Sequence, residues 1–269
     1  MRLAPAALLL GLALCSSASA QVQARTRPDA VGDTYRYRSE TRYAEKSRDG
    51  MEAQVNSQVF ELKVLGVSPE GLRVRYTLVE ATVADTAGPA MKAPLQAAVG
   101  GVLDFRMDRN GMVTAVDNWP DYKARFLGKI DAALPAGDQI RNIVHQRMNQ
   151  DPVEAAQDLV LGDLALLRAM ELRGPVALGR VESLDTRRRP PPRVVTETSV
   201  KTPGCVLHIN RVTTGTTVGA VQKTTADADV SVKDGRVLSF TQNRVERAGA
   251  TVVDERLMIK RLSAAPGCP

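Results

Sequence analysis

Hydrophobic and polar residues alternate strictly in several stretches of the chain, a pattern that predicts amphipathic β-strands. In residues 34–43, Tyr35, Tyr37 and Tyr43 share one face, and arginines and Glu40 occupy the other. A half-buried strand with its tyrosines turned inward is therefore expected. The charged outer face could bind an anion, but a solvated surface is the commoner role of such a row.

Residues 55–65 and 72–83 alternate in the same way. Residues 102–117 predict two more strands joined by Asn110-Gly111, the pair that best tolerates both positions of a type I′ turn. Residues 21–117 are thus predicted to form the first unit, a five-stranded antiparallel meander. Its first ten residues, 21–30, are predicted to be a loose polar leader.

The spacing of apolar residues changes from two to three or four in residues 118–173. This change predicts a helical segment that packs on the sheet. Apolar residues recur at spacings of three and four, forming one stripe: Trp119, Tyr122, Phe126, Ile130 and Leu134. Asp138 and Asp151 stand where helix caps are expected, the latter followed by proline. Residues 159–170 are very apolar, and the pattern leaves open whether they stay helical beyond Gly162.

Residues 174–269 predict a second five-stranded meander, with strands at 194–201, 205–214, 226–233, 236–246 and 251–261. Its hairpin at Asp234-Gly235 has the layout of the one at 102–117, which suggests an internal repeat. The predicted fold class is α+β, mainly antiparallel β, with a helical insertion between two meanders. These form an open barrel or a curved sheet; one wrapped sheet and two domains both remain open.

Residues 1–20 have the features of a secretory signal peptide: Arg2, a short apolar run and the small-residue site Ala18-Ser19-Ala20. Cleavage after Ala20 would place the protein in the periplasm or outside the cell. In the alternative, Cys15 is lipidated instead of removed, although Leu14 is a poor fit to a lipoprotein box.

Cys205 and Cys268 remain after cleavage, and an even count in an exported chain predicts a disulfide. Such a bond would tie the C-terminal residues to a mid-chain strand. It would stabilise the fold by roughly 4 kcal/mol in the chain-entropy model. Two free thiols are the alternative.

Charge and composition narrow the classes of binding partner to be expected. The chain has 36 Lys and Arg against 30 Asp and Glu, and loss of Arg2 leaves a scattered balance of +5. Aromatic residues make up only 4%, which disfavours nucleic-acid binding. The chain lacks a later apolar run long enough for a transmembrane segment. Oligomeric state is not indicated.

Common catalytic and metal motifs are missing. His145 and His208 have no second ligand at metal-binding spacing, and neither Gly-x-Ser-x-Gly nor a phosphate-binding loop occurs. We therefore predict no catalytic residues, no metal and no cofactor. Because the sequence singles out no pair among its many carboxylates, a carboxylate-dependent hydrolase is kept as an alternative.

The aromatic residues Trp119, Tyr122 and Phe126 allow two interpretations. A stripe at helical spacing usually packs in the core. It could also form a lid over an apolar cavity, which makes these three residues the candidate hydrophobic-ligand site.

Signal peptide, amphipathic strands and short helices together resemble the open β-barrel proteins of the bacterial envelope, the LolA/LolB-like lipoprotein carriers and receptors. The resemblance is one of layout, with no family-specific motif. It implies a curved sheet around helices and an apolar cavity for acyl chains. We therefore expect an exported, non-catalytic protein that binds a hydrophobic ligand (a lipid or acyl chain) or an envelope protein. A structural or interaction module acting through sheet edges is the other alternative.

Overall fold

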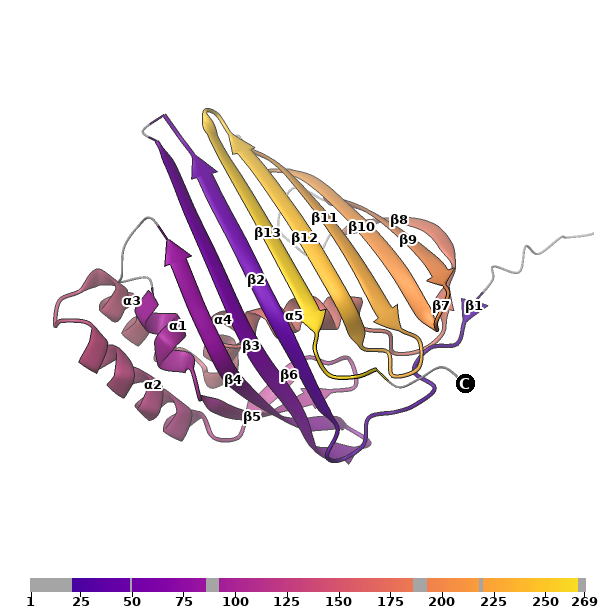
Figure 1. The fold of residues 1–269 in the computed structure, drawn as a ribbon, viewed down its shortest axis with the longest axis horizontal. Helices are drawn as coiled ribbons and strands as arrows, with labels where there is room; N and C mark the ends of the chain where they lie inside the picture. The colour runs from indigo at the N-terminus through magenta and orange to yellow at the C-terminus, as the bar shows by residue number, and fades with distance from the viewer. Residues whose placement is uncertain (1–20, 49, 86–91, 186–192, 218–219, 266–269) are drawn as a thin grey trace, which may run out of the picture.

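A computed structural model describes residues 21–48, 50–85, 92–185, 193–217 and 220–265. Its main element is one eleven-stranded antiparallel sheet in the order β6-β5-β4-β3-β2-β13-β12-β11-β10-β9-β8 (Figure 1). The fold class predicted from the sequence is confirmed: the protein is α+β and mainly antiparallel, and the sheet does not close into a barrel.

The strands of the first half are β2 (Thr34–Lys46), β3 (Met51–Ser68), β4 (Gly71–Asp85), β5 (Val102–Asp108) and β6 (Val113–Val116). Those of the second half are β8 (Gly179–Asp185), β9 (Arg193–Thr202), β10 (Val206–Thr217), β11 (Ala220–Ser231), β12 (Val237–Ala248) and β13 (Thr251–Arg261). A separate two-stranded sheet pairs β1 (Gln21–Val22) with β7 (Val176–Ala177).

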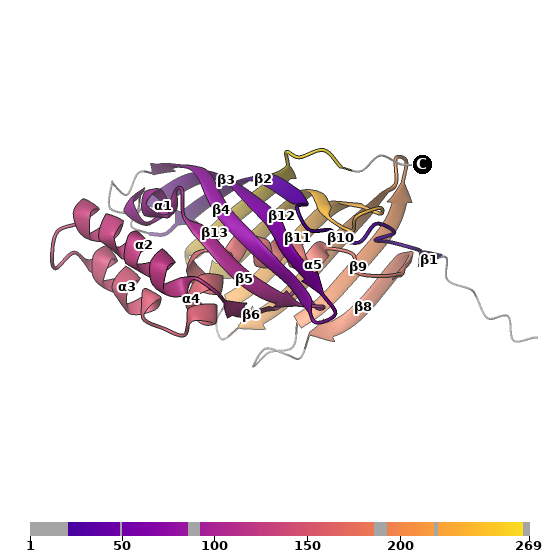
Figure 2. The same cartoon turned by 90° about the horizontal axis from the view of Figure 1, so that it is seen from below.

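The helices lie on one side of the sheet, inside its curve (Figure 2). They are α1 (Lys92–Ala98), α2 (Trp119–Ala133), α3 (Gln139–Met148), α4 (Pro152–Leu159) and α5 (Gly162–Met170). The apolar run therefore stays helical beyond Gly162, but as a second helix after a break. Within the described part of the chain, no helix is long and apolar enough to cross a membrane.

The two halves of the chain form a single sheet because β2 pairs with β13, with Tyr37 opposite Arg261. The first half has the five strands that were predicted, whereas the second has six. The unpredicted strand is β8, in which Val181 and Leu184 stand three residues apart and so give no period-two signal.

The hairpin connecting β5 and β6 differs from the expected two-residue type I′ turn. Gly111 has a φ of +73°, but Asn110 does not have a positive φ, and the loop spans four residues. The Asp108 side chain closes this wider loop by accepting a hydrogen bond from the Met112 amide at 2.8 Å. The positive φ favours glycine there, and a Cβ at Gly111 would lie 2.3 Å from a guanidinium nitrogen of Arg173 and so displace that side chain.

Residues 21–30 are not a loose leader. Val22 and Ala24 are buried, and the Arg25 amide donates a hydrogen bond to the Val232 carbonyl at 2.7 Å. The pattern gave no sign of this because the segment is held by backbone pairing and ion pairs rather than by an apolar period.

The predicted helix signals are confirmed at α3 and α4, where Asp138 and Asp151 accept hydrogen bonds from first-turn amides. Asn118 does not cap α2 with its side chain. Its side-chain amide instead donates a hydrogen bond to the Val102 carbonyl and accepts one from the Asp104 backbone N–H, both in β5. The helix thereby follows the sheet without a loop, and its predicted apolar stripe is buried.

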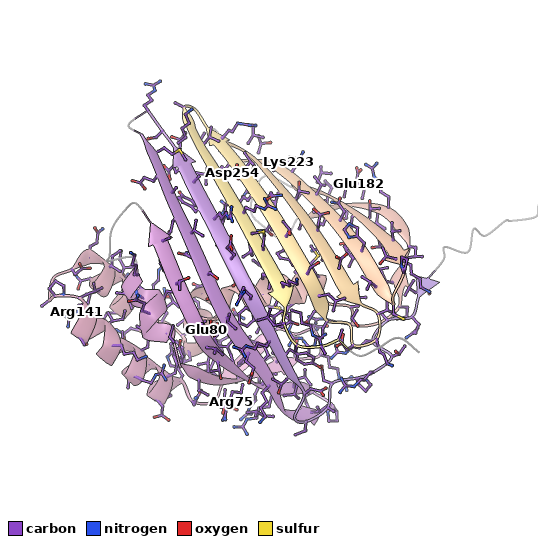
Figure 3. All side chains as sticks on the ribbon, viewed as in Figure 1. Arg75, Glu80, Arg141, Glu182, Lys223 and Asp254 are labelled. Atoms are coloured by element: carbon purple, nitrogen blue, oxygen red, sulfur yellow. The ribbon has the colours of Figure 1, made fainter. Side chains whose placement is uncertain are left out.

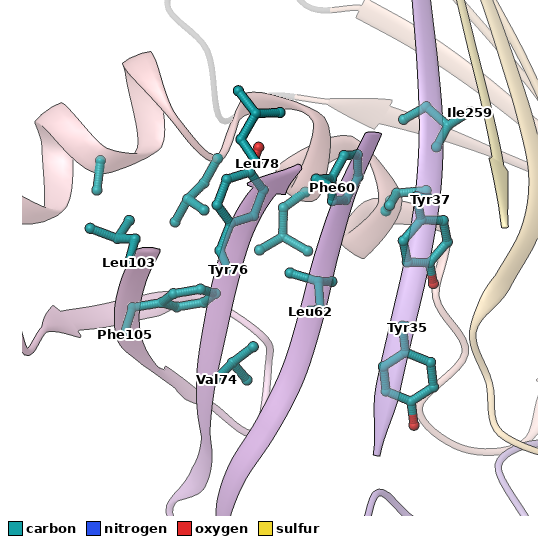
Figure 4. Packing of buried hydrophobic residues seen from close by; sticks show 14 of the residues in the cluster. Tyr35, Tyr37, Phe60, Leu62, Val74, Tyr76, Leu78, Leu103, Phe105 and Ile259 are labelled. Carbon is teal, nitrogen blue, oxygen red and sulfur yellow. The ribbon is translucent and has the colours of Figure 1, made fainter. Parts of the chain in front are cut away.

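The core lies between the helices and the concave face of the sheet (Figure 4). The rings of Tyr37, Phe60 and Tyr76 stack across β2, β3 and β4 with centroids 5.5 Å apart. The convex face carries charged side chains, among them Asp254, Lys223 and Glu182 (Figure 3). The charged outer row predicted for β2 lies on this face, where Arg42 pairs with Glu40 at 2.7 Å.

Candidate functional site

Each long strand has an inner face that is apolar along one half and polar along the other. In β3, Phe60 and Leu62 are buried, whereas Gln54 and Asn56 continue the same face and are half-buried. We call the two regions the packed half and the open half. The packed half contains Tyr35, Tyr37, Phe60, Leu62, Leu207, Ile209, Phe240, Leu257 and Ile259. The open half contains Thr41, Tyr43, Gln54, Asn56, Arg211, Thr213, Gln242, Arg244 and Glu255.

A groove of about 1210 Å³ lies over the open half, between the inner face of β8–β12 and helices α4 and α5. Its helical side is mainly apolar, with Leu161, Leu164 and Leu166, and its polar members are Gln157, Asp158 and Arg168. The exposed side chains of Met112 and Val181 line it from the β5–β6 turn and from β8. A polar wall therefore faces an apolar one.

Arginines on the polar wall are held by carboxylates of the same or a neighbouring strand. Arg211 donates to Glu197 through Nε at 2.9 Å and through Nη2 at 2.6 Å. Its Nη2 also reaches the Ala169 carbonyl at the end of α5, at 3.3 Å. Arg244 pairs with Glu246 at 2.9 Å and with Glu255 at 3.5 Å. The wall is thus ordered by ion pairs rather than by apolar packing.

A second, smaller cavity of about 290 Å³ lies between the helices and strands β3 and β4. It is lined mainly by apolar side chains of five elements, including Leu78, Leu95, Phe126 and Val144. On the β3 side the lining is amide: Gln54, Asn56 and Gln58. The Asn56 Oδ1 atom is buried without a hydrogen-bond partner, so it can accept a hydrogen bond from a ligand.

The three predicted ligand residues lie together on α2, with stacked rings and centroids 5.9 and 6.1 Å apart. Trp119, Tyr122 and Phe126 are each buried, 5–6% exposed. Only Phe126 lines the smaller cavity. The structure brings the three together as core, and places one of them at a cavity wall.

The corner between α4 and α5 separates the two spaces. Leu159 and Val160 line the smaller cavity, and the next residue, Leu161, lines the groove. The apolar cavity and the mixed groove are therefore neighbours on one concave face, divided by the short segment of residues 159–161.

Beneath the groove, the packed half ends in a buried ion cluster that the sequence did not reveal. The Arg236 guanidinium donates to Asp29 at 2.7 Å and to Glu171 at 2.8 Å, and all three side chains are 2% exposed. It also lies 4.6 Å above the Tyr35 ring. The cluster ties the N-terminal segment, the end of α5 and the start of β12 together.

Arg168 connects this cluster to the groove. Its Nη1 donates to Glu171 at 2.7 Å, its side chain is 9% exposed, and it lines the groove. Burial lowers the pKa of Arg168 to about 10, so it stays charged at neutral pH. Burial alone would raise the pKa of Glu171, but the charges of Arg168 and Arg236 outweigh it and the pKa is lowered.

Among the described residues, Asp163 at the start of α5 is the one carboxyl group with a raised pKa. Burial raises it, and hydrogen bonds from Ser39 and Gln58 oppose the shift. Its neighbours are thus a hydroxyl and an amide rather than a second carboxylate.

The histidines lie apart from both spaces. His145 contacts Asp131 at 2.7 Å on the helical surface, and His208 contacts Asp229 at 2.9 Å on the sheet. Among the residues that the structure describes, no group of three His, Cys, Asp or Glu side chains could hold a metal ion.

Three predictions concern residues that the structure does not describe. Residues 1–20, with Cys15, lie outside the described residues, and so does Cys268. Cys205 stands at the turn before β10, with a φ of +57°. The signal peptide, the alternative lipidation of Cys15 and the Cys205–Cys268 disulfide therefore stay predictions.

The amide residues of the smaller cavity were missed although their signal is present in the sequence. Gln54, Asn56 and Gln58 continue the alternate positions of Phe60 and Leu62 with polar residues. A face that turns from apolar to amide along one strand indicates that core packing stops partway. The arginines carry no comparable signal, because a strand arginine is usually a surface residue.

Comparison with known proteins gives no family. No family model matches the chain, and no curated protein matches it. A solved structure described as lipid–protein interactions in lipovitellin aligns with 89% of this chain at 11% identity and a TM-score of 0.49; the chain spans 26% of that protein. The structure of DynF from the dynemicin biosynthesis pathway of Micromonospora chersina aligns over 91% of this chain and 86% of its own, at 5% identity and a TM-score of 0.21. Neither score is high enough to establish a common fold.

Proposed function

We propose that this chain is an exported binding protein for an amphiphile, a ligand with an acyl-like tail and a polar head. One observation carries the proposal: an apolar cavity and a half-polar groove adjoin on the same concave face, separated only by residues 159–161. Ligand sites are usually apolar concavities with a few polar groups that fix orientation. The lipid-binding interpretation of Phe126 is supported by its place in the cavity wall.

Filling the cavity tests this proposal. Ala98 lines it from α1, whereas Gln96 on the same helix is exposed. The variant Ala98→Phe should place its ring in the space that the tail would occupy, and Gln96→Phe should leave that space open. Each buried methylene contributes about 0.8 kcal/mol, so losing room for two of them predicts about tenfold weaker binding.

The measurement is displacement of an environment-sensitive dye by dodecanol, with native mass spectrometry of protein purified from its own envelope. Thermal unfolding of both variants checks that they fold. If Ala98→Phe binds dodecanol as well as Gln96→Phe does, the tail does not enter this cavity and the proposal fails.

A second function, an interaction module acting through a sheet edge, is favoured by one feature of β8. This edge strand exposes Val181 at 57% and Leu184 at 64%, and unpaired edges add strands readily. A crosslinker placed at Ser183 should capture an envelope protein, and the capture should be lost in Val181→Lys. Crosslinking that Val181→Lys leaves unchanged would remove this function.

The third alternative, a carboxylate-dependent hydrolase, stays a prediction without a paired site. Such an enzyme needs two acidic side chains close together in a cleft. Asp163 has the raised pKa, but its contacts are Ser39 and Gln58.

A further inference from the structure

Four arginines line the groove, Arg168, Arg173, Arg211 and Arg244, together with two acidic residues, Asp158 and Glu197. Carboxylates pair with Arg168, Arg211 and Arg244 and offset much of their charge, whereas Arg173 forms no ion pair with a described carboxylate. An anion in the groove would therefore meet the N–H donors that these guanidinium groups leave free.

Several of these arginines keep donors that no described residue accepts. Nε of Arg168 and Nε of Arg244 are buried without a partner. Arg211 uses Nε and Nη2 on Glu197, and no described residue accepts a hydrogen bond from its Nη1. A buried donor without an acceptor costs about 1–3 kcal/mol. The oxygens of a phosphate or carboxylate group could satisfy such donors.

Three of the four arginines lie near the end of α5. The start of the helix presents Leu161 and Leu164 next to the corner with the apolar cavity. Its end holds Arg168, and Arg211 reaches across from β10 to the Ala169 carbonyl there. Arg173 follows and donates to the Arg109 carbonyl of the β5–β6 turn at 3.3 Å. The groove thus runs from apolar to cationic over the length of one short helix.

We propose that the groove selects an amphiphile with an anionic head, a phosphate or carboxylate bound at the end of α5 by Arg168, Arg173 and Arg211. The inference rests on the proposed function and adds the class of ligand. The tail would point toward the α4–α5 corner, and the head would accept hydrogen bonds from both walls.

The test uses the full mature chain and three probes: dodecyl phosphate, dodecanol and inorganic phosphate. Isothermal titration calorimetry at low salt should show dodecyl phosphate binding at least about tenfold more tightly than dodecanol, as expected when charge-assisted hydrogen bonds are added. The double variant Arg173→Gln/Arg211→Gln should lose most of this preference. Arg168 is left unchanged because its loss would remove one of the two arginines that pair with the buried Glu171.

Arg180→Gln is the matched control, since Arg180 lies on β8 with its side chain 69% exposed and does not line the groove. Equal affinity for dodecyl phosphate and dodecanol would overturn the inference and leave the proposed function standing. So would an anion preference that survives in the double variant. Inorganic phosphate binding as tightly as dodecyl phosphate would assign the arginines to a free anion instead. Failure of both dodecyl probes would overturn the proposed function itself.

Discussion

The packed half and the open half of the inner face are built from the same strands, yet they are held in different ways. In the packed half, Tyr37, Phe60 and Phe240 are 2% exposed or less. Burying each such side chain contributes about 1.5–3 kcal/mol. Further along the inner face, Asn56 lines the smaller cavity and Arg244 lines the groove, and both are only partly buried.

The difference shows how one sheet can serve both as scaffold and as binding surface. Helices α4 and α5 cover only part of the strand length, so the remainder stays open to a ligand. The buried ion cluster around Arg236 closes the packed half at its far end. The open half, by contrast, is ordered by half-exposed ion pairs that contribute little to stability.

The largest expected difference between the halves lies in two arginines at or near β12. Arg236→Met would remove the buried guanidinium that Asp29 and Glu171 share and leave each of them one remaining arginine, Arg25 and Arg168, which should cost about 3 kcal/mol. Arg244→Met removes a side chain that is 40% exposed, and should cost about 1 kcal/mol or less. Urea unfolding measures both. If the two variants lose equal stability, the open half is as much a part of the core as the packed half.

Much of the packed half and of the helices could be predicted from local sequence patterns. The inward rows of β2 and β3, the buried stripe of α2 and the capping roles of Asp138 and Asp151 follow from local rules. These rules act within a few residues, so one sequence contains them in full.

The rest depends on contacts between distant segments. The pairing of β2 with β13, which makes one sheet from two meanders, has no local signal. Asp29 and Arg236 meet although 207 residues separate them. Phe126 could be named as a candidate from the helix stripe, but Leu95 and Arg211 could not, because a cavity wall is assembled from strands and helices that the sequence does not place together.

The stability of the folded chain should depend on pH through Asp163. Because burial raises its pKa in the folded chain above the unfolded value, folding favours the protonated form. Its contribution to stability is therefore fully present below about pH 4, near the unfolded pKa, and is lost as the pH rises through the raised pKa. Asp163→Asn should then be more stable than the native chain at pH 7, and the two should converge in acid.

Urea unfolding from pH 3 to pH 8 gives this difference directly. Asp158→Asn on the exposed side of α4 is the matched control. A difference between Asp163→Asn and the native chain that stays constant with pH would show that Asp163 is solvated, and the packed half would then end before α5.

The smallest effect is expected at the boundary itself, where the Oδ1 atom of Asn56 is buried without a partner. Asn56→Leu removes that unsatisfied acceptor and places an apolar side chain in the wall of the smaller cavity, on the far side of Gln58 from Phe60. It should raise the free energy of unfolding by about 1 kcal/mol, whereas Asn243→Leu on the exposed face of β12 should change it by less than about 0.5 kcal/mol. A loss of stability in Asn56→Leu would mean that this amide makes hydrogen bonds in the folded chain, and proton exchange with water would then show whether it is hydrated. If it is hydrated, the smaller cavity would belong to the open half, and a ligand tail would have to displace water to enter it.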